Sequence, residues 1–314
     1  MAFSATDAAL EGFRIARERP MTMLSWAAAS LVISVLTALG TVLLFGDSMA
    51  AMMAMSNRTS ADPTQSMALM AQLGVFYLFL MPIALLIFSV FTGAVYRAVL
   101  QPADSRLAYL RLGADEMRLA VVLVVLFVLS MVVTLAASIL FAIIGVMVGV
   151  GLVALMGGDP GVGGAIGAVM LMLLLYAVMI FISLAFWTRF SLAGPMTFAE
   201  KRILIFESWT ATKGRFWPLF GCYLLAGLLG LVVSILGMAI SFAVMASLGG
   251  LAGNAGGFLG MMEALQPNYE SLATYFTAAM IANLVITSVF SSLTYAIFLA
   301  PPAVVYRDLI QNKG

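Results

Sequence analysis

Six long apolar stretches, none of which contains a Lys, Arg, Asp or Glu, set the main constraint on how this chain can fold. An α-helix rises 1.5 Å per residue and the hydrocarbon core of a bilayer is roughly 30 Å thick, so about 20 such residues can span a membrane. The stretches comprise residues 21–45, 69–96, 119–156, 165–188, 217–248 and 275–306. The sequence therefore predicts an all-α membrane protein, a single integral domain (residues 1–314) that forms a bundle of six transmembrane helices.

The composition excludes several classes of function. Hydrophobic residues make up 63% of the chain and charged residues only 9%, against roughly 25% charged residues in a typical soluble domain. The sequence has no His, and its single Cys, Cys222, lies inside an apolar stretch. Disulfide frameworks, Cys/His metal sites and His-activated nucleophiles are therefore excluded. A net charge of +1 gives no reason to expect nucleic acid as a partner, and we assign no catalytic residue, metal or cofactor.

The positive charges gather at one end of the predicted helices. Of the 15 Lys and Arg residues, all except Arg58 fall in the terminal segments or in the loops that follow the second and fourth stretches. Lys and Arg are enriched in cytoplasmic loops, so we expect both termini in the cytoplasm and three hairpin tips outside. Asp7, Glu11 and Glu18 precede a first stretch that is long enough to span, which argues against a cleaved signal peptide.

A threefold pattern is visible at the predicted cytoplasmic face. A short amphipathic segment precedes the first, third and fifth stretches, at residues 4–19, 104–112 and about 197–212, and each leads up to a basic residue at the membrane edge: Arg19, Arg118 and Arg215. This predicts three repeats (residues 1–100, 101–194 and 195–314), each an interfacial helix followed by a transmembrane hairpin. The alternative is that any six-span protein carries basic residues at these edges. Mitochondrial carriers also have three two-helix units, but their charged signature in the odd helices is missing here.

Local signals support these segments. Ser4 and Asp7 are expected to cap the first helix, and Asp115 is expected to be the N-cap of the third stretch. In the third segment, Ile203, Phe206 and Trp209 have helical spacing. The third stretch is longer than a bilayer requires, so we expect it to bend or protrude.

Basic residues at these edges are the predicted contacts with membrane lipids. Long Lys and Arg side chains reach from the membrane edge to anionic headgroups. The predicted headgroup contacts are Arg14, Arg17, Arg19, Arg118, Lys213 and Arg215.

Rows of hydroxyl and amide side chains occur within three of the stretches. They comprise Ser30, Ser34, Thr37 and Thr41 in the first, Ser130, Thr134 and Ser138 in the third, and Asn283, Thr287 and Ser291 in the sixth. Such rows serve helix packing, or they line a cavity. The candidates for a cavity are Asn283, Thr287, Ser130 and Thr134. The absence of ionisable residues from all six stretches disfavours a proton pump.

The third cytoplasmic segment carries a family resemblance. The run Arg189-Phe-Ser-Leu-Ala-Gly-Pro195, followed by Glu207-Ser-Trp209 and Lys213-Gly-Arg-Phe-Trp217, resembles the membrane domain that some bacteria fuse to glycerophosphodiester phosphodiesterases, and related free-standing six-span proteins of unknown function. The phosphodiesterase barrel, with its His and metal-binding acids, is absent, so that activity does not carry over. The resemblance implies a bacterial cytoplasmic membrane and a connection with lipid or envelope metabolism.

These features lead to two functional hypotheses. The first is a non-catalytic scaffold or accessory subunit linked to lipid or envelope homeostasis, with membrane lipids and another membrane protein as partners. The alternative is a transporter of a lipid or other hydrophobic solute. Convergence of the polar rows in one cavity would favour transport, whereas their burial in helix contacts would favour the scaffold.

Overall fold

A computed structural model describes residues 4–56, 63–155, 161–250 and 266–309. Within these ranges the chain is all-α, and six of its helices are long and apolar enough to cross a membrane. They match the six predicted stretches in order and confirm the fold class. Their bounds are α2 (Pro20–Ser56), α3 (Pro63–Leu100), α4 (Ala114–Leu155), α5 (Gly161–Phe190), α8 (Phe216–Met245) and α11 (Ala278–Leu309). Arg58, the one Lys or Arg that falls in a predicted outer loop, lies outside the described residues.

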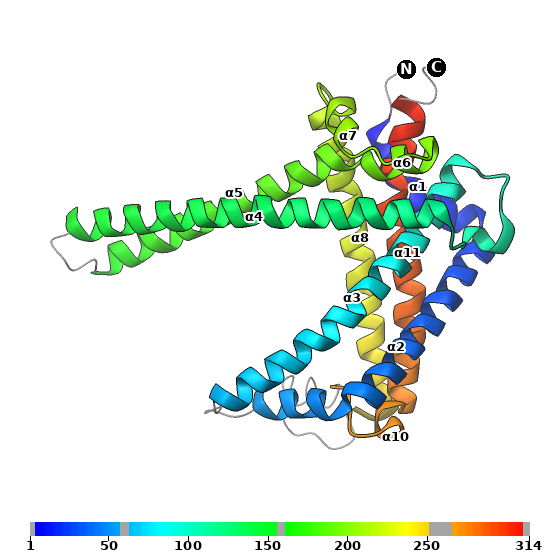
Figure 1. Cartoon of the computed structure of the whole chain (residues 1–314), viewed down its shortest axis with the longest axis horizontal. Coiled ribbons are helices and arrows are strands. Elements are labelled where there is room, and N and C mark those ends of the chain that lie inside the picture. The colour runs from blue at the N-terminus through cyan, green and yellow to red at the C-terminus, as the bar shows by residue number, and fades with distance from the viewer. Residues whose placement is uncertain (1–3, 57–62, 156–160, 251–265, 310–314) are drawn as a thin grey trace.

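The six long helices are not parallel. Figure 1 shows α8 and α11 side by side. Helix α3 ends beside them and lies farther from them toward its N-terminal end, whereas α2 crosses to the N-terminal end of α11, where Ala38 and Val42 pack. The α4–α5 hairpin leaves this group and runs across the direction of α8 and α11. We call the end where α1 (Ala5–Glu18), α6 (Ala193–Glu200) and α7 (Phe206–Ala211) lie the charged end, since most Lys and Arg residues gather there.

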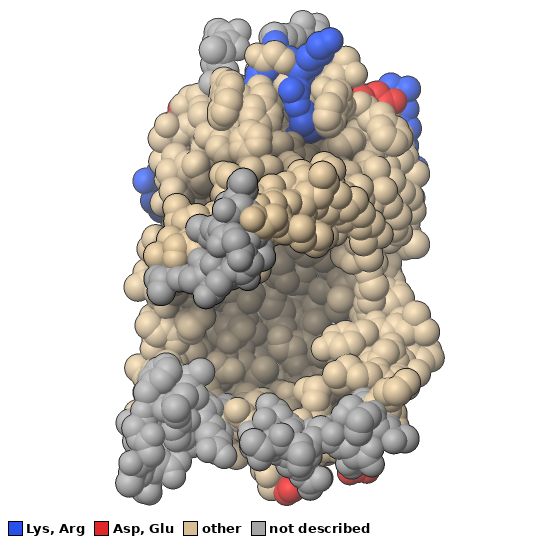
Figure 2. Space-filling model, turned by 90° about the vertical axis from the view of Figure 1, so that its left-hand side faces the viewer, with Lys and Arg blue, Asp and Glu red and all other residues tan. Residues whose placement is uncertain are grey.

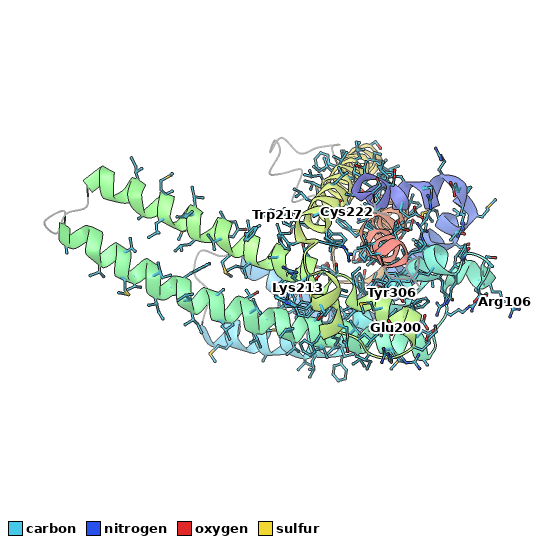
Figure 3. The ribbon with its side chains drawn as sticks, turned by 90° about the horizontal axis from the view of Figure 1, so that it is seen from above. Arg106, Glu200, Lys213, Trp217, Cys222 and Tyr306 are labelled. Carbon is cyan, nitrogen blue, oxygen red and sulfur yellow. The ribbon has the colours of Figure 1, made fainter. Side chains whose placement is uncertain are left out.

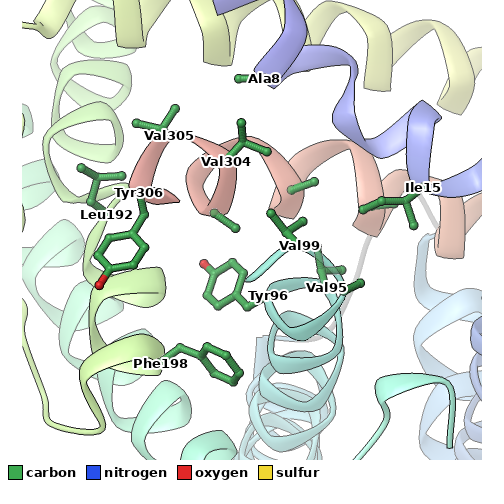
Figure 4. Packing of buried hydrophobic residues seen from close by; sticks show 14 of the residues in the cluster. Ala8, Ile15, Val95, Tyr96, Val99, Leu192, Phe198, Val304, Val305 and Tyr306 are labelled. Carbon is green, nitrogen blue, oxygen red and sulfur yellow. The ribbon is translucent and has the colours of Figure 1, made fainter. Parts of the chain in front are cut away.

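The first short helix, α1, packs directly on α11. The backbone N–H of Asp7 donates to Ser4 Oγ at 3.2 Å, so Ser4 is the N-cap as predicted. Ala8 is fully buried, and Figure 4 shows it next to Val304 and Val305 of α11. At Gly12 a Cβ atom would lie 2.5 Å from the Cα of Ile297, so only glycine permits this approach. The contact makes α1 a part of the helical core.

The other two short segments differ from the predicted helices. Residues 104–112 contain only the 3₁₀ turn η1 (Arg106–Tyr109), in which Leu107 and Ala108 have φ of 51° and 52°. The predicted helix in this segment is therefore wrong. The third segment is divided between α6 and α7, because Lys201 takes a left-handed conformation with φ of 58°. Only the first segment is one continuous helix, and the three-repeat organisation stays a prediction.

The largest apolar core lies at the charged end. Residues from α1, α2, α3, α6, α8 and α11 form it, and Trp26, Phe91, Phe198 and Leu219 are among those almost completely buried. Figure 4 shows Tyr96 of α3 and Phe198 of α6 facing each other there, with ring centroids 6.0 Å apart. Smaller clusters join the far ends of α2, α3 and α11. The long helices are thus held together mainly at one end.

The α4–α5 hairpin is joined to this core only at its base. Helix α4 continues over 42 residues, so the third predicted stretch protrudes from the core as one long helix. Val122 and Leu126 pack there against Phe186, Phe190 and Ile205. Farther along α4, large side chains such as Leu135 and Met147 are exposed. The hairpin therefore presents apolar surface on several sides, which fits a lipid environment.

Candidate functional site

A buried ion pair connects α3 and α4 at the charged end. Arg97, at the end of α3, pairs with Glu116 in the first turn of α4, and their side chains are 5% and 0% exposed. Arg97 also donates to the carbonyl oxygen of Tyr109 at 3.1 Å. Oε2 of Glu116 has no hydrogen-bond partner among the described residues. Gly93 makes room for this carboxylate, since a Cβ there would lie 2.6 Å from its Oε1.

Asp115 extends this junction to α6. Its carboxylate accepts from Lys201 Nζ at 2.6 Å and from an Arg118 nitrogen at 2.8 Å. Asp115 is not the N-cap that we expected, because α4 begins one residue earlier, at Ala114. The cluster pairs three basic side chains with two carboxylates and ties α3, α4 and α6 together. Among the described residues, no group of three or more His, Cys, Asp or Glu side chains could hold a metal ion.

The six predicted headgroup contacts divide into two groups. Three use their guanidinium groups within the chain: Arg14 pairs with Glu11, Arg118 pairs with Asp115, and Arg19 donates to Ala98 O and Tyr109 Oη. The side chains of the others have no ion-pair or hydrogen-bond partner among the described residues. These three are Arg17, Lys213 and Arg215.

Arg14, from the first group, and Lys213, from the second, lie in different surroundings. Burial raises the pKa of the Glu11 carboxyl above its usual value, against the lowering effect of Arg14. Viewed from the charged end, Lys213 lies where the α4–α5 hairpin meets the other helices (Figure 3). Contact of the six residues with lipid headgroups stays a prediction.

An apolar pocket of about 500 Å³ opens between the base of the α4–α5 hairpin and helices α3, α8 and α11. Its lining is mostly apolar, with contributions such as Leu123, Leu184, Leu224 and Phe298. Figure 2 shows this side of the molecule hollowed, and the visible surface of the hollow is uncharged. The pocket has the size of a site for a small molecule or a lipid chain.

Few free polar groups face the apolar pocket. Thr92, Thr188, Ser191 and Tyr223 contribute to its lining, and each hydroxyl donates to an acceptor in the chain at 2.7 to 2.9 Å. Among these, the Tyr223 hydroxyl connects α8 to Ser191 at the end of α5. Because these donors are already engaged, the pocket offers mainly hydrocarbon contacts to an occupant.

A second, polar pocket of about 390 Å³ lies between α8 and α11, nearer their far ends. Asn283 and Thr287, two of the predicted cavity residues, line it. The other hydroxyl residues of its lining are Ser234, Ser241, Ser291, Thr294 and Tyr295.

The two pockets follow one another along the same faces of two helices. On α8 the lining residues recur at intervals of three, four or seven, and they pass from apolar to polar: Phe220, Leu224, Leu231, Ser234, Met238 and Ser241. On α11 the corresponding series is Pro302, Phe298, Tyr295, Ser291, Thr287 and Asn283. Residues three and four apart share a helix face. Phe88 of the apolar pocket also contacts Tyr295 of the polar pocket, with ring centroids 6.1 Å apart.

The structure does not bring the predicted polar rows together. Ser130 and Thr134 lie on α4, away from both pockets, and the Ser130 hydroxyl donates to its own helix at Phe127 O. The row of α2 lies elsewhere, where Thr37 and Thr41 line a pocket between α2 and α3.

Sequence reasoning missed Ser234 and Ser241. Their separation of two helical turns is a signal that could have identified them. With Asn283 and Thr287 they form the polar half of the site.

Comparisons of the chain with models of known protein families, with curated proteins and with solved structures find no match. The assignment of a function therefore depends on the residues and the geometry described above.

Proposed function

We propose that this chain is a non-catalytic membrane protein that binds a membrane lipid in the apolar pocket and acts as a scaffold or accessory subunit in lipid or envelope homeostasis. The observation that carries this proposal is the apolar pocket itself, which opens on the side of a chain with six membrane-spanning candidates. A cavity that faces hydrocarbon and offers few free donors is suited to an acyl chain. The sequence resemblance to bacterial membrane domains linked to lipid enzymes supports the same assignment.

The proposed location is the bacterial cytoplasmic membrane, with both termini in the cytoplasm. The distribution of Lys and Arg supports this orientation. Arg17, Lys213 and Arg215 are the residues at the charged end that we expect to contact anionic headgroups, since their side chains have no partner among the described residues.

A substitution that fills the apolar pocket tests the proposal. Gly227 lines the pocket, and a Cβ placed there would have no atom within 4 Å, so Gly227→Phe adds a ring without a direct backbone clash. We expect this variant, purified in nanodiscs, to retain severalfold less lipid per protein by native mass spectrometry than the unmodified chain.

Gly221→Phe is the matched control. Gly221 lies on the same helix with equal free space, but it does not line the pocket. Equal lipid retention by the two variants would refute lipid binding in the apolar pocket. Copurification of a stoichiometric protein with the unmodified chain would identify the partner of the proposed scaffold.

Transport of a lipid or hydrophobic solute is the second candidate. The observation that favours it is the polar pocket, which continues the line of the apolar pocket along α8 and α11. A reconstituted vesicle assay of lipid transfer between leaflets tests it. Transport predicts transfer that Gly227→Phe inhibits and Gly221→Phe does not.

A further inference from the structure

The polar pocket contains hydrogen-bonding groups without partners in the part of the chain that the structure describes. Ser234, Ser241 and Ser291 make no side-chain hydrogen bond with these residues. The Asn283 carbonyl oxygen has one long contact, 3.5 Å from Thr287 Oγ1, while its amide nitrogen donates to none of the described residues. Polar groups left unsatisfied in a hydrocarbon environment are costly. These side chains therefore indicate a polar occupant.

The chemistry of the lining restricts that occupant. The polar groups are hydroxyls and one amide, which both donate and accept, and none of the lining residues is Lys, Arg, Asp or Glu. An anionic phosphate headgroup in this half of the membrane would lack a counter-charge, and burial of an unpaired charge is strongly unfavourable. An uncharged, hydroxyl-bearing group matches the lining.

A second transmembrane helix fits this pocket less well. Close approach between helices in membranes uses small residues at the contact. Two glycines of α8 near the pocket already contact aromatic rings of α11: a Cβ at Gly230 would lie 2.5 Å from Phe298, and one at Gly237 would lie 2.7 Å from Phe290. These two small-residue positions of α8 are thus filled from within the chain.

We propose that the polar pocket binds the uncharged, hydroxyl-bearing headgroup of a lipid whose acyl chains extend along α8 and α11 toward the apolar pocket. The inference rests on the proposed function, because the same lipid occupies both pockets. It adds the lipid class: a neutral lipid such as a diacylglycerol or a glycosylated diacylglycerol. The headgroup lies at Ser234, Ser241 and Asn283, and the acyl chains pass Leu231 and Phe298.

Competition between two lipids with the same acyl chains tests the headgroup assignment. The full chain is reconstituted in phosphatidylethanolamine nanodiscs that contain dioleoylglycerol and dioleoylphosphatidylglycerol in equal amounts, and bound lipid is measured by native mass spectrometry. We expect preferential retention of dioleoylglycerol. Asn283→Leu should lower that preference about threefold to tenfold, which is the range of single hydrogen bonds in membranes. Ser241→Ala, a smaller change, should lower it in the same direction.

Controls separate this inference from the proposed function. Ser288→Ala removes a hydroxyl of α11 that is buried, bonded to Leu284 O and outside the pocket, and it should leave the preference unchanged. Gly227→Phe should reduce the total retained lipid, whereas Asn283→Leu should change only its composition. Equal retention of the two lipids or preference for the phosphatidylglycerol would overturn the headgroup assignment. So would the mass of a protein dimer that Asn283→Leu abolishes, because a second copy of the protein would then occupy the pocket. Unchanged total lipid in Gly227→Phe would instead overturn the proposed function.

Discussion

Arg97 and Glu116 show how single residues organise the charged end. Both are almost fully buried, and together they connect the last turn of α3 to the first turn of α4. A buried ion pair adds little net stability when it is intact, but removal of one partner leaves an uncompensated charge. The pair therefore specifies where the α4–α5 hairpin joins the core. Asp115 adds a second ion pair at this junction, with Lys201 just after α6.

Removal of Arg97 tests this role. Arg97→Met should lower the free energy of unfolding in detergent by about 3–5 kcal/mol, because Glu116 would remain buried without its partner. The double variant Arg97→Met, Glu116→Leu should recover most of that loss. Arg202→Met, which alters an exposed pair with Glu200, should change the free energy by less than about 1 kcal/mol. Equal losses in the single and double variants would contradict the ion-pair explanation.

Glycine determines the packing between elements at several points of the bundle. On α1, Gly12 lies against the backbone of α11, and on α8, Gly230 accommodates the ring of Phe298. A side chain at either position would meet atoms at less than 3 Å. Backbone approach of this kind is the usual way in which membrane helices associate.

Gly12→Ala should separate α1 from α11. The added Cβ would lie 2.5 Å from Ile297 Cα, and overpacking of this kind costs about 1–3 kcal/mol. Hydrogen exchange of the α1 backbone amides should therefore accelerate. Gly40→Ala on α2 is the control, since a Cβ there meets no atom within 4 Å. Alanine favours an isolated helix over glycine, so unchanged or slower exchange in Gly12→Ala would show that the contact does not hold α1.

The helical elements were predictable from the sequence to different extents. The six long helices follow from uninterrupted apolar stretches, a property that is local to each segment. The turn η1 and the break at Lys201 were missed, because the apolar spacing of residues 104–112 and 197–212 suits a helix whereas the backbone adopts left-handed conformations there. The Arg97–Glu116 pair and the pocket between α8 and α11 depend on contacts between distant segments. Asn283 stands out in the sequence, since an amide within an apolar stretch needs a partner, and it lines the polar pocket.

At the scale of the whole molecule, one end is a packed core and the other is open. The main core and the charged clusters lie together at the charged end, while α3 and the α4–α5 hairpin extend away from α8 and α11 in different directions and α2 packs near the far end of α11. The two pockets follow the α8–α11 face between these extensions. This arrangement leaves a lateral route by which the proposed lipid would reach both pockets.

Cysteine labelling tests the orientation of the whole chain. The native Cys222 is fully buried, so it should give little background. Asn268→Cys, at the end opposite the charged end, should react with an impermeant maleimide in intact cells. Ser4→Cys at the charged end should react only after permeabilisation, because Lys and Arg favour the cytoplasm. The reverse pattern would place both termini outside.

The contact between α1 and α11 also has a consequence for biosynthesis. A ribosome makes the buried face of α1, which includes Ala8 and Ile15, long before it makes α11. At roughly 5–20 residues per second, the segment between these helices takes on the order of 10 to 50 s to synthesise. Throughout that interval the first helix lacks its main native partner, although it can already contact α2 and later α8, so the nascent chain must be inserted, and protected from proteolysis, before its core can close.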